Sequence, residues 1–101
     1  MAGAFITQGA SVARSSDVVL SQAYPTPVST LVRIPFESRM GGELLLTFHD
    51  ITGREVRRAA KPVATGRQEI EADLSALPSG IYTYRLTLGQ TVVTGQVVVA
   101  R

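Results

Sequence analysis

Residues capable of acid–base, nucleophilic or metal chemistry are scarce in this chain of 101 residues. It has one histidine, His49, and no cysteine, which excludes a thiolate metal site and a cysteine nucleophile. His49 is followed directly by Asp50, and neighbours in a strand point to opposite faces, so they cannot orient one another as in a hydrolytic triad. We also find no phosphate-binding loop and no dinucleotide fingerprint. The sequence therefore predicts a protein that is not an enzyme and takes no cofactor or metal.

Three carboxylates, those of Glu69, Glu71 and Asp73, alternate with apolar residues. In a strand this spacing gives a row of carboxylates about 6–7 Å apart on one face. Calcium needs six to eight oxygens that converge on one point, so we interpret the row as a solvated face.

A cluster of cations precedes that row between residues 54 and 67. The segment contains no aromatic residue, and the net charge of the whole chain is only +2, so nucleic acid is not an expected partner. If residues 62–66 form a hairpin, arginines such as Arg57 would face carboxylates such as Glu71 across it.

Tyr82 and Tyr84 share a strand face with Leu86 and Leu88, which favours a place in the core. Tyr82 also follows the corner at residues 75–80 (SALPSG) and is placed like a tyrosine-corner residue, whose hydroxyl bonds to the corner backbone. A carbohydrate-binding module is the weakest alternative, because it requires exposed coplanar aromatic rings, and with three tyrosines, three phenylalanines and no tryptophan most of the rings are assigned to the core.

Short alternating segments separated by turn residues must position all of these side chains. We expect strands near residues 18–22, 29–37, 43–50, 54–60, 67–74, 81–88 and 91–100. Pro35 predicts an edge strand or a bulge for the second of them, and Gly53 fits a tight turn after Asp50. About seven strands without a long helix predict an all-β fold, an immunoglobulin-like antiparallel β-sandwich.

The expected domain organisation is a flexible lead-in over residues 1–16 and one immunoglobulin-like domain over residues 17–101. The first thirteen residues lack the basic start of a signal peptide. No window approaches the roughly 18 apolar residues that a membrane span needs, so direct membrane insertion is not expected.

Four blocks in this order resemble the type A C-terminal sorting domain of bacterial type IX secretion. They are Tyr24-Pro25-Thr26-Pro27, residues 48–56 (FHDITGREV), residues 77–86 (LPSGIYTYRL) and residues 97–101 (VVVAR). Thr26 stands where the family commonly has asparagine, and His49 where an aromatic residue is frequent. The family usually follows a large cargo protein, so the chain resembles the tail of something longer.

The resemblance implies a non-catalytic label that directs a cargo protein through the periplasm to the cell surface. The implied partners are proteins: an outer-membrane translocon and a sortase-like peptidase, which would cut near residues 13–17. The last strand offers an edge for strand addition. The residues expected to take part in recognition are Tyr24, Pro25, Pro27, Asp50, Gly53, Arg54, Gly80, Tyr82, Arg85, Val97, Val98, Val99 and Arg101.

An immunoglobulin-like assembly module is the alternative function. Such a module would dock onto a larger extracytoplasmic or membrane-associated complex and remain there in stoichiometric amounts. A sorting signal would instead be cleaved from its cargo, and this difference separates the two interpretations.

Overall fold

Seven strands make up most of the part of the chain that the computed structural model describes, residues 17–101. In most of the strands buried positions alternate with more exposed ones, so that one face is buried and the other solvated. The strands are β1 (Val18–Leu20), β2 (Leu31–Ser38), β3 (Gly42–His49), β4 (Glu55–Val63), β5 (Gly66–Asp73), β6 (Gly80–Leu88) and β7 (Thr91–Val99). Within this range no helix is long and apolar enough to cross a membrane.

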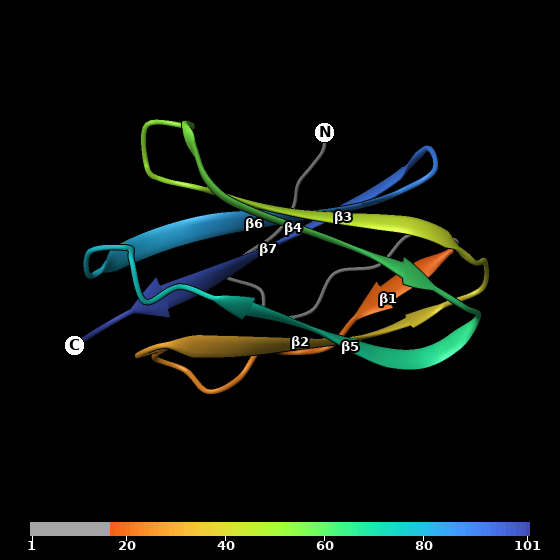
Figure 1. Ribbon diagram of the computed structural model, residues 1–101, viewed down its shortest axis with the longest axis horizontal. Helices are drawn as coiled ribbons and strands as arrows, with labels where there is room; N and C mark the ends of the chain where they lie inside the picture. The colour runs from red at the N-terminus through yellow and green to blue at the C-terminus, as the bar shows by residue number, and fades with distance from the viewer. Residues whose placement is uncertain (1–16) are drawn as a thin grey trace.

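The strands form two antiparallel sheets that pack face to face (Figure 1). One sheet has three strands in the order β1-β2-β5, and the other has four in the order β4-β3-β6-β7. The chain passes from one sheet to the other after β2, after β4 and after β5. The predicted all-β sandwich is confirmed, and the arrangement is compatible with an immunoglobulin-like fold.

The core lies between the inner faces of the two sheets. Phe48 and Tyr84 are at its centre, with ring centroids 6.0 Å apart and ring planes tilted by 51°. Tyr84 is 1% exposed and Tyr82 is 6% exposed, which confirms that both rings belong to the core. They therefore do not form an exposed carbohydrate platform.

The expectation of an edge strand or a bulge at Pro35 is wrong, because β2 is the central strand of its sheet and its register with β5 is continuous. The reason is the shortness of β1. The pairing of β1 with β2 ends at the pair Leu20 and Phe36. Just beyond this pair, the carbonyl of Pro35 accepts the backbone N–H of Ser21 at 2.9 Å. Proline is tolerated here because the missing N–H faces the place where the neighbouring strand has already ended.

The expected hairpin at residues 62–66 is also not formed. β4 and β5 are edge strands of different sheets, so this connection crosses the sandwich. Glu71 pairs with Arg33 of the neighbouring β2 at 3.0 Å, and Arg57 donates instead to the carbonyl of Asp73 at 2.9 Å. Arg57 thus links the two sheets at their edge.

Candidate recognition surface

The four sequence blocks meet at one end of the sandwich, which we call the motif end. It contains the connection from β1 to β2, the turn from β3 to β4, the corner from β5 to β6 and the last residues of β7 (Figure 1, left). The strand register gives the same result, since His49 lies opposite Thr83 and Gly80 lies opposite Val99. Segments up to 77 residues apart in the sequence are thus brought to one surface.

The turn from β3 to β4 is built around the carboxylate of Asp50. One of its oxygens accepts the backbone N–H of Thr52 at 2.9 Å, the Thr52 hydroxyl at 2.6 Å and the backbone N–H of Arg54 at 3.1 Å. The other oxygen lies 3.4 Å from the Arg54 guanidinium. The Thr52 hydroxyl bond, followed by the backbone bonds and Arg54, lowers the pKa of Asp50. Gly53 adopts a φ of 88°, as expected for this turn.

The corner between β5 and β6 is held from inside by Tyr82. Its hydroxyl donates to the carbonyl of Pro78 at 2.6 Å, which confirms the predicted tyrosine corner. Ser75 supports the start of the corner by donating its backbone N–H to the carboxylate of Asp73 at 2.9 Å. Hydrogen bonds from the backbone N–H and the side chain of Ser75 lower the pKa of Asp73, with smaller contributions from the charges of Arg57 and Arg101.

Substitution of Tyr82 by phenylalanine should lower the free energy of unfolding by about 1 kcal/mol, because a partly buried hydrogen bond is lost while the ring remains. Urea unfolding followed by circular dichroism measures the change. A Tyr24→Phe variant is the matched control, since its hydroxyl bonds to the exposed Glu69 and should contribute less. Equal losses in the two variants would argue against the corner bond as a stabilising contact.

The segment that begins with Tyr24 connects β2 of one sheet with the outer edge of β7 in the other. Tyr24 exchanges two backbone hydrogen bonds with Arg33, at 2.9 and 2.7 Å, and its side chain is exposed. Val28, which the sequence did not single out, is fully buried and donates its N–H to the carbonyl of Val98 at 2.7 Å. The carbonyl of Val28 accepts the N–H of Ala100 at 2.9 Å. An isolated apolar residue after two prolines was the only signal for this contact.

Arg101 lies on the motif end with its side chain folded back over the corner. Its Nε donates to the carbonyl of Ser29 at 2.9 Å, and one Nη donates to the carbonyl of Leu74 at 2.5 Å. The other Nη bonds to the carbonyl of Leu77. The guanidinium therefore joins three segments of the chain, and we call this arrangement the Arg101 clamp.

β7 is an edge strand, as the strand-addition hypothesis requires, but its outer edge is not uniformly open. Val28 occupies the edge at Val98 and Ala100. Because alternate residues of an antiparallel strand direct their backbone groups to the same side, those of Val92, Thr94 and Gln96 also face outward. None of the hydrogen bonds outside the sheets of residues 17–101 uses them. Any strand addition would therefore use residues 92–96.

The predicted recognition residues divide into a buried group and an exposed group. The side chains of Tyr82, Val97 and Val99 are buried in the core, so they can influence recognition only by maintaining the fold. The exposed members are Tyr24, Pro25, Pro27, Gly53, Arg54, Arg85, Val98 and Arg101, and Asp50 and Gly80 are half-buried.

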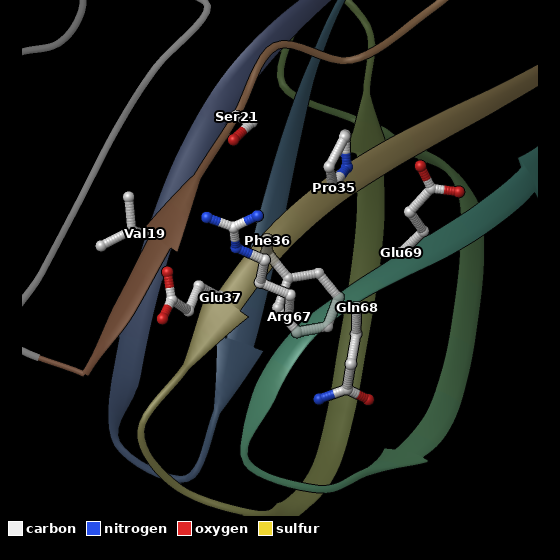
Figure 2. Close-up of a pocket in the computed structure, with 8 residues that line it drawn as sticks. All are labelled: Val19, Ser21, Pro35, Phe36, Glu37, Arg67, Gln68 and Glu69. Atoms are coloured by element: carbon white, nitrogen blue, oxygen red, sulfur yellow. The ribbon is translucent and has the colours of Figure 1, made fainter.

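Two shallow hollows lie on the outer faces of the sheets. One is formed where β1 ends, between Val19, Glu37, Arg67 and Glu69, and Figure 2 shows the Arg67 side chain extending from β5 across β2. It includes none of the predicted recognition residues. The other lies at the motif end and is lined by His49, Asp50, Ile51, Gly53, Thr83 and Arg85. In the described part of the chain no group of acidic or histidine side chains is arranged to hold a metal.

Comparison with known families decides between the interpretations. A family profile described as "Secretion system C-terminal sorting domain" matches residues 22–100. The chain belongs to this family. The sorting domain is the C-terminal signal of type IX secretion cargo, a non-catalytic family, and it directs export toward the cell surface or the extracellular space. The comparison with curated proteins found no match.

The match begins after β1 and covers the first three blocks completely, ending one residue before Arg101. The matched range thus includes the strands of both sheets apart from β1, together with the strap formed by residues 24–28. The match supports the sorting interpretation, and nothing favours the assembly alternative.

Proposed function

We propose that this sorting domain is recognised in the periplasm by the outer-membrane translocon of type IX secretion and is removed at the cell surface by a sortase-like peptidase. The family match over residues 22–100 is the observation that supports the proposal. The domain acts as a label that folds and is read by protein partners. It performs no catalysis itself and requires no cofactor, nucleic acid or small molecule.

The motif end is the surface that the translocon reads in this proposal. Support comes from the convergence of four blocks from distant parts of the sequence on one exposed end (Figure 1). The Asp50 turn and the Tyr82 corner are each fixed by side-chain hydrogen bonds, so they present a pre-organised shape. Pre-organisation reduces the entropy lost on binding, which suits a signal that must be read on many cargo proteins.

The peptidase would cut within residues 13–17, where the proposed lead-in of residues 1–16 meets the proposed domain of residues 17–101. Residues 13–16 lie outside the described part of the chain. Asp17 is already joined to the sandwich, because its carboxylate accepts the Thr91 hydroxyl at 3.0 Å and its carbonyl accepts the N–H of Arg39 at 2.9 Å. A cut before Asp17 would therefore leave every described strand in place.

A reporter protein carrying a periplasmic signal, with residues 15–101 fused to its C-terminus, tests the proposal in a host that has type IX secretion. We expect the reporter at the cell surface or in the medium, and periplasmic retention would overturn the sorting function. The mature junction is then read by mass spectrometry. A junction inside β1 would contradict the proposed cleavage segment.

Two exposed turn arginines provide a matched test of the motif end. Arg54 lies in the Asp50 turn, and Arg39 lies in the turn between β2 and β3 at the opposite end. We expect Arg54→Ala to slow reporter export several-fold and Arg39→Ala to leave it unchanged. Equal export of the two variants would show that the translocon reads another part of the domain.

A further inference from the structure

The outer face of the strand pair β2–β5 differs in charge from the outer face of the strand pair β6–β7. The outward residues of β2 and β5 are Leu31, Arg33, Pro35, Glu37, Arg67, Glu69, Glu71 and Asp73, and six of these eight are charged. The outward residues of β6 and β7 are Ile81, Thr83, Arg85, Thr87, Val92, Thr94, Gln96 and Val98, and Arg85 alone is charged. A protein surface that only has to stay in solution would resemble the first face. The second, which we call the β6–β7 face, has the charge-poor composition of a binding surface.

Arg85 stands at the centre of this face among threonines. In the strand register Arg85 lies opposite Thr47 of β3 and opposite Thr94 of β7. Along β6 itself, Thr83 and Thr87 lie two residues away on the same face. These short side chains offer no charge to the guanidinium. Thr47 is only 6% exposed, as expected for a short side chain between longer neighbours.

Arg85 also lacks the kind of partner that five of the described arginines have. Arg33, Arg54 and Arg58 each lie within 4.0 Å of a carboxylate, and Arg57 and Arg101 donate to carbonyls. Among residues 17–101 no carboxylate lies that close to Arg85. An exposed guanidinium with five N–H donors and no carboxylate within 4.0 Å is complementary to an incoming carboxylate.

Exposed apolar side chains lie toward both ends of the β6–β7 face. Ile81 and Val98 lie opposite one another in the register at the motif end and are 49% and 42% exposed. Val92, at the other end of the face, is 49% exposed, and Ile51 at the tip of the Asp50 turn is 86% exposed. The hollow that contains both Ile51 and Arg85 makes the β6–β7 face continuous with the motif end. An arginine surrounded by uncharged and apolar groups is typical of an interface hot spot.

We infer that the β6–β7 face is the docking surface for a protein of the secretion machinery that places a carboxylate on Arg85 and apolar side chains on Ile81 and Val98. The inference rests on the proposed function, because it extends the surface that the machinery reads from the motif end onto this face. A single cation cannot hold nucleic acid or an anionic membrane surface, so the occupant is a folded protein with a complementary acidic group.

The reporter fusion tests this inference with charge-matched variants. Arg85→Gln removes the cation from the β6–β7 face, and Arg67→Gln removes an equally unpaired cation from the opposite face. We expect Arg85→Gln to lower the initial rate of export about ten-fold and Arg67→Gln to leave it unchanged. Arg85→Lys should give an intermediate rate, because lysine keeps the charge but not the two-pronged geometry.

A second variant keeps Arg85 but pairs its guanidinium with a carboxylate of the domain itself. Thr94→Glu places a carboxylate directly across the strand pair from Arg85, where it should form an internal ion pair. Export should fall as in Arg85→Gln, while the thermal midpoint of each purified domain stays within about 2 °C of the parent. These midpoints separate a lost contact from a lost fold.

Each outcome either supports or overturns the inference. Export of Arg85→Gln and Thr94→Glu at the parent rate would overturn it while leaving the sorting function intact. Periplasmic retention of the parent fusion would overturn both. A second copy of the domain is the other possible occupant, and sedimentation that shows a dimer lost in Arg85→Gln would overturn docking to a machinery protein.

Discussion

Replacement of Gly95 by alanine should lower the free energy of unfolding of the sorting domain by about 2–4 kcal/mol. Gly95 lies on β7 directly opposite Tyr84 of β6. A Cβ at this position would lie 2.4 Å from both Cζ and the hydroxyl oxygen of Tyr84 and 2.8 Å from Cε2. Overpacking of a core commonly costs about 1–3 kcal/mol, and here the ring is rigid and enclosed, which places the effect at the upper end. Domains of this size have about 5–15 kcal/mol in total.

The reason for this sensitivity is that Tyr84 has no room to move away. It is 1% exposed, belongs to an inner strand of the four-stranded sheet and packs against Phe48. Glycine in a strand commonly marks such a close approach of a neighbouring ring. The methyl group must therefore displace the ring from the core or force β7 away from β6, and either change removes buried contacts.

Urea unfolding of the purified domain measures the effect, with Thr94→Ala as a control because its side chain points to solvent from the adjacent position. A double variant, Gly95→Ala with Tyr84→Leu, should recover part of the loss if the ring causes it. The tyrosine absorbance gives an independent signal. Burial raises the pKa of Tyr84 to about 12, and a displaced ring should titrate nearer its ordinary value of 10. An unchanged stability and an unchanged titration would contradict the packing.

The sequence was sufficient to predict those features that depend on local pattern. Alternation of apolar and polar residues gave the number and approximate bounds of the strands, because burial of one face imposes a period of two. The Asp50 turn and the Tyr82 corner were also predictable. In both, a side chain bonds to backbone within four residues, so the partners are fixed by the chain itself.

Features that depend on which strands become neighbours were not predictable from the same pattern. Alternation does not state which sheet a strand joins, and this is why Pro35 was expected at an edge and Arg57 opposite Glu71. The Arg101 clamp and the contact of Val28 with β7 join residues more than 20 positions apart. Such contacts follow from the crossing of the chain between sheets. The isolation of Arg85 is likewise visible only when the register is known.

Removal of the Arg101 clamp should loosen the end of the sorting domain without unfolding it. The guanidinium donates to the carbonyls of Ser29, Leu74 and Leu77, and these groups are only partly buried. Hydrogen bonds to a charged donor contribute about 1.5–3 kcal/mol each when buried, and solvent reduces this here, so we expect Arg101→Ala to cost about 2 kcal/mol in total. Arg101→Lys should recover less than half, because an ammonium group on a flexible stem cannot reach three diverging carbonyls.

Amide hydrogen exchange at individual residues should show the effect of the clamp more clearly than the global free energy of unfolding does. The amides of Val28 and Ala100 bond across the outer edge of β7, where the strap and the clamp meet that strand. In Arg101→Ala we expect these two amides to exchange with solvent at least about ten-fold faster, while the amide of Tyr84, in the middle of β6, changes only with the global stability. Equal acceleration at all three would mean that the loss is global. If only these two amides exchange faster, the strap that covers Val98 and Ala100 can detach from β7 while the rest of the domain stays folded. Export of the reporter that carries Arg101→Ala then shows whether the translocon reads the covered edge of β7 or the open one.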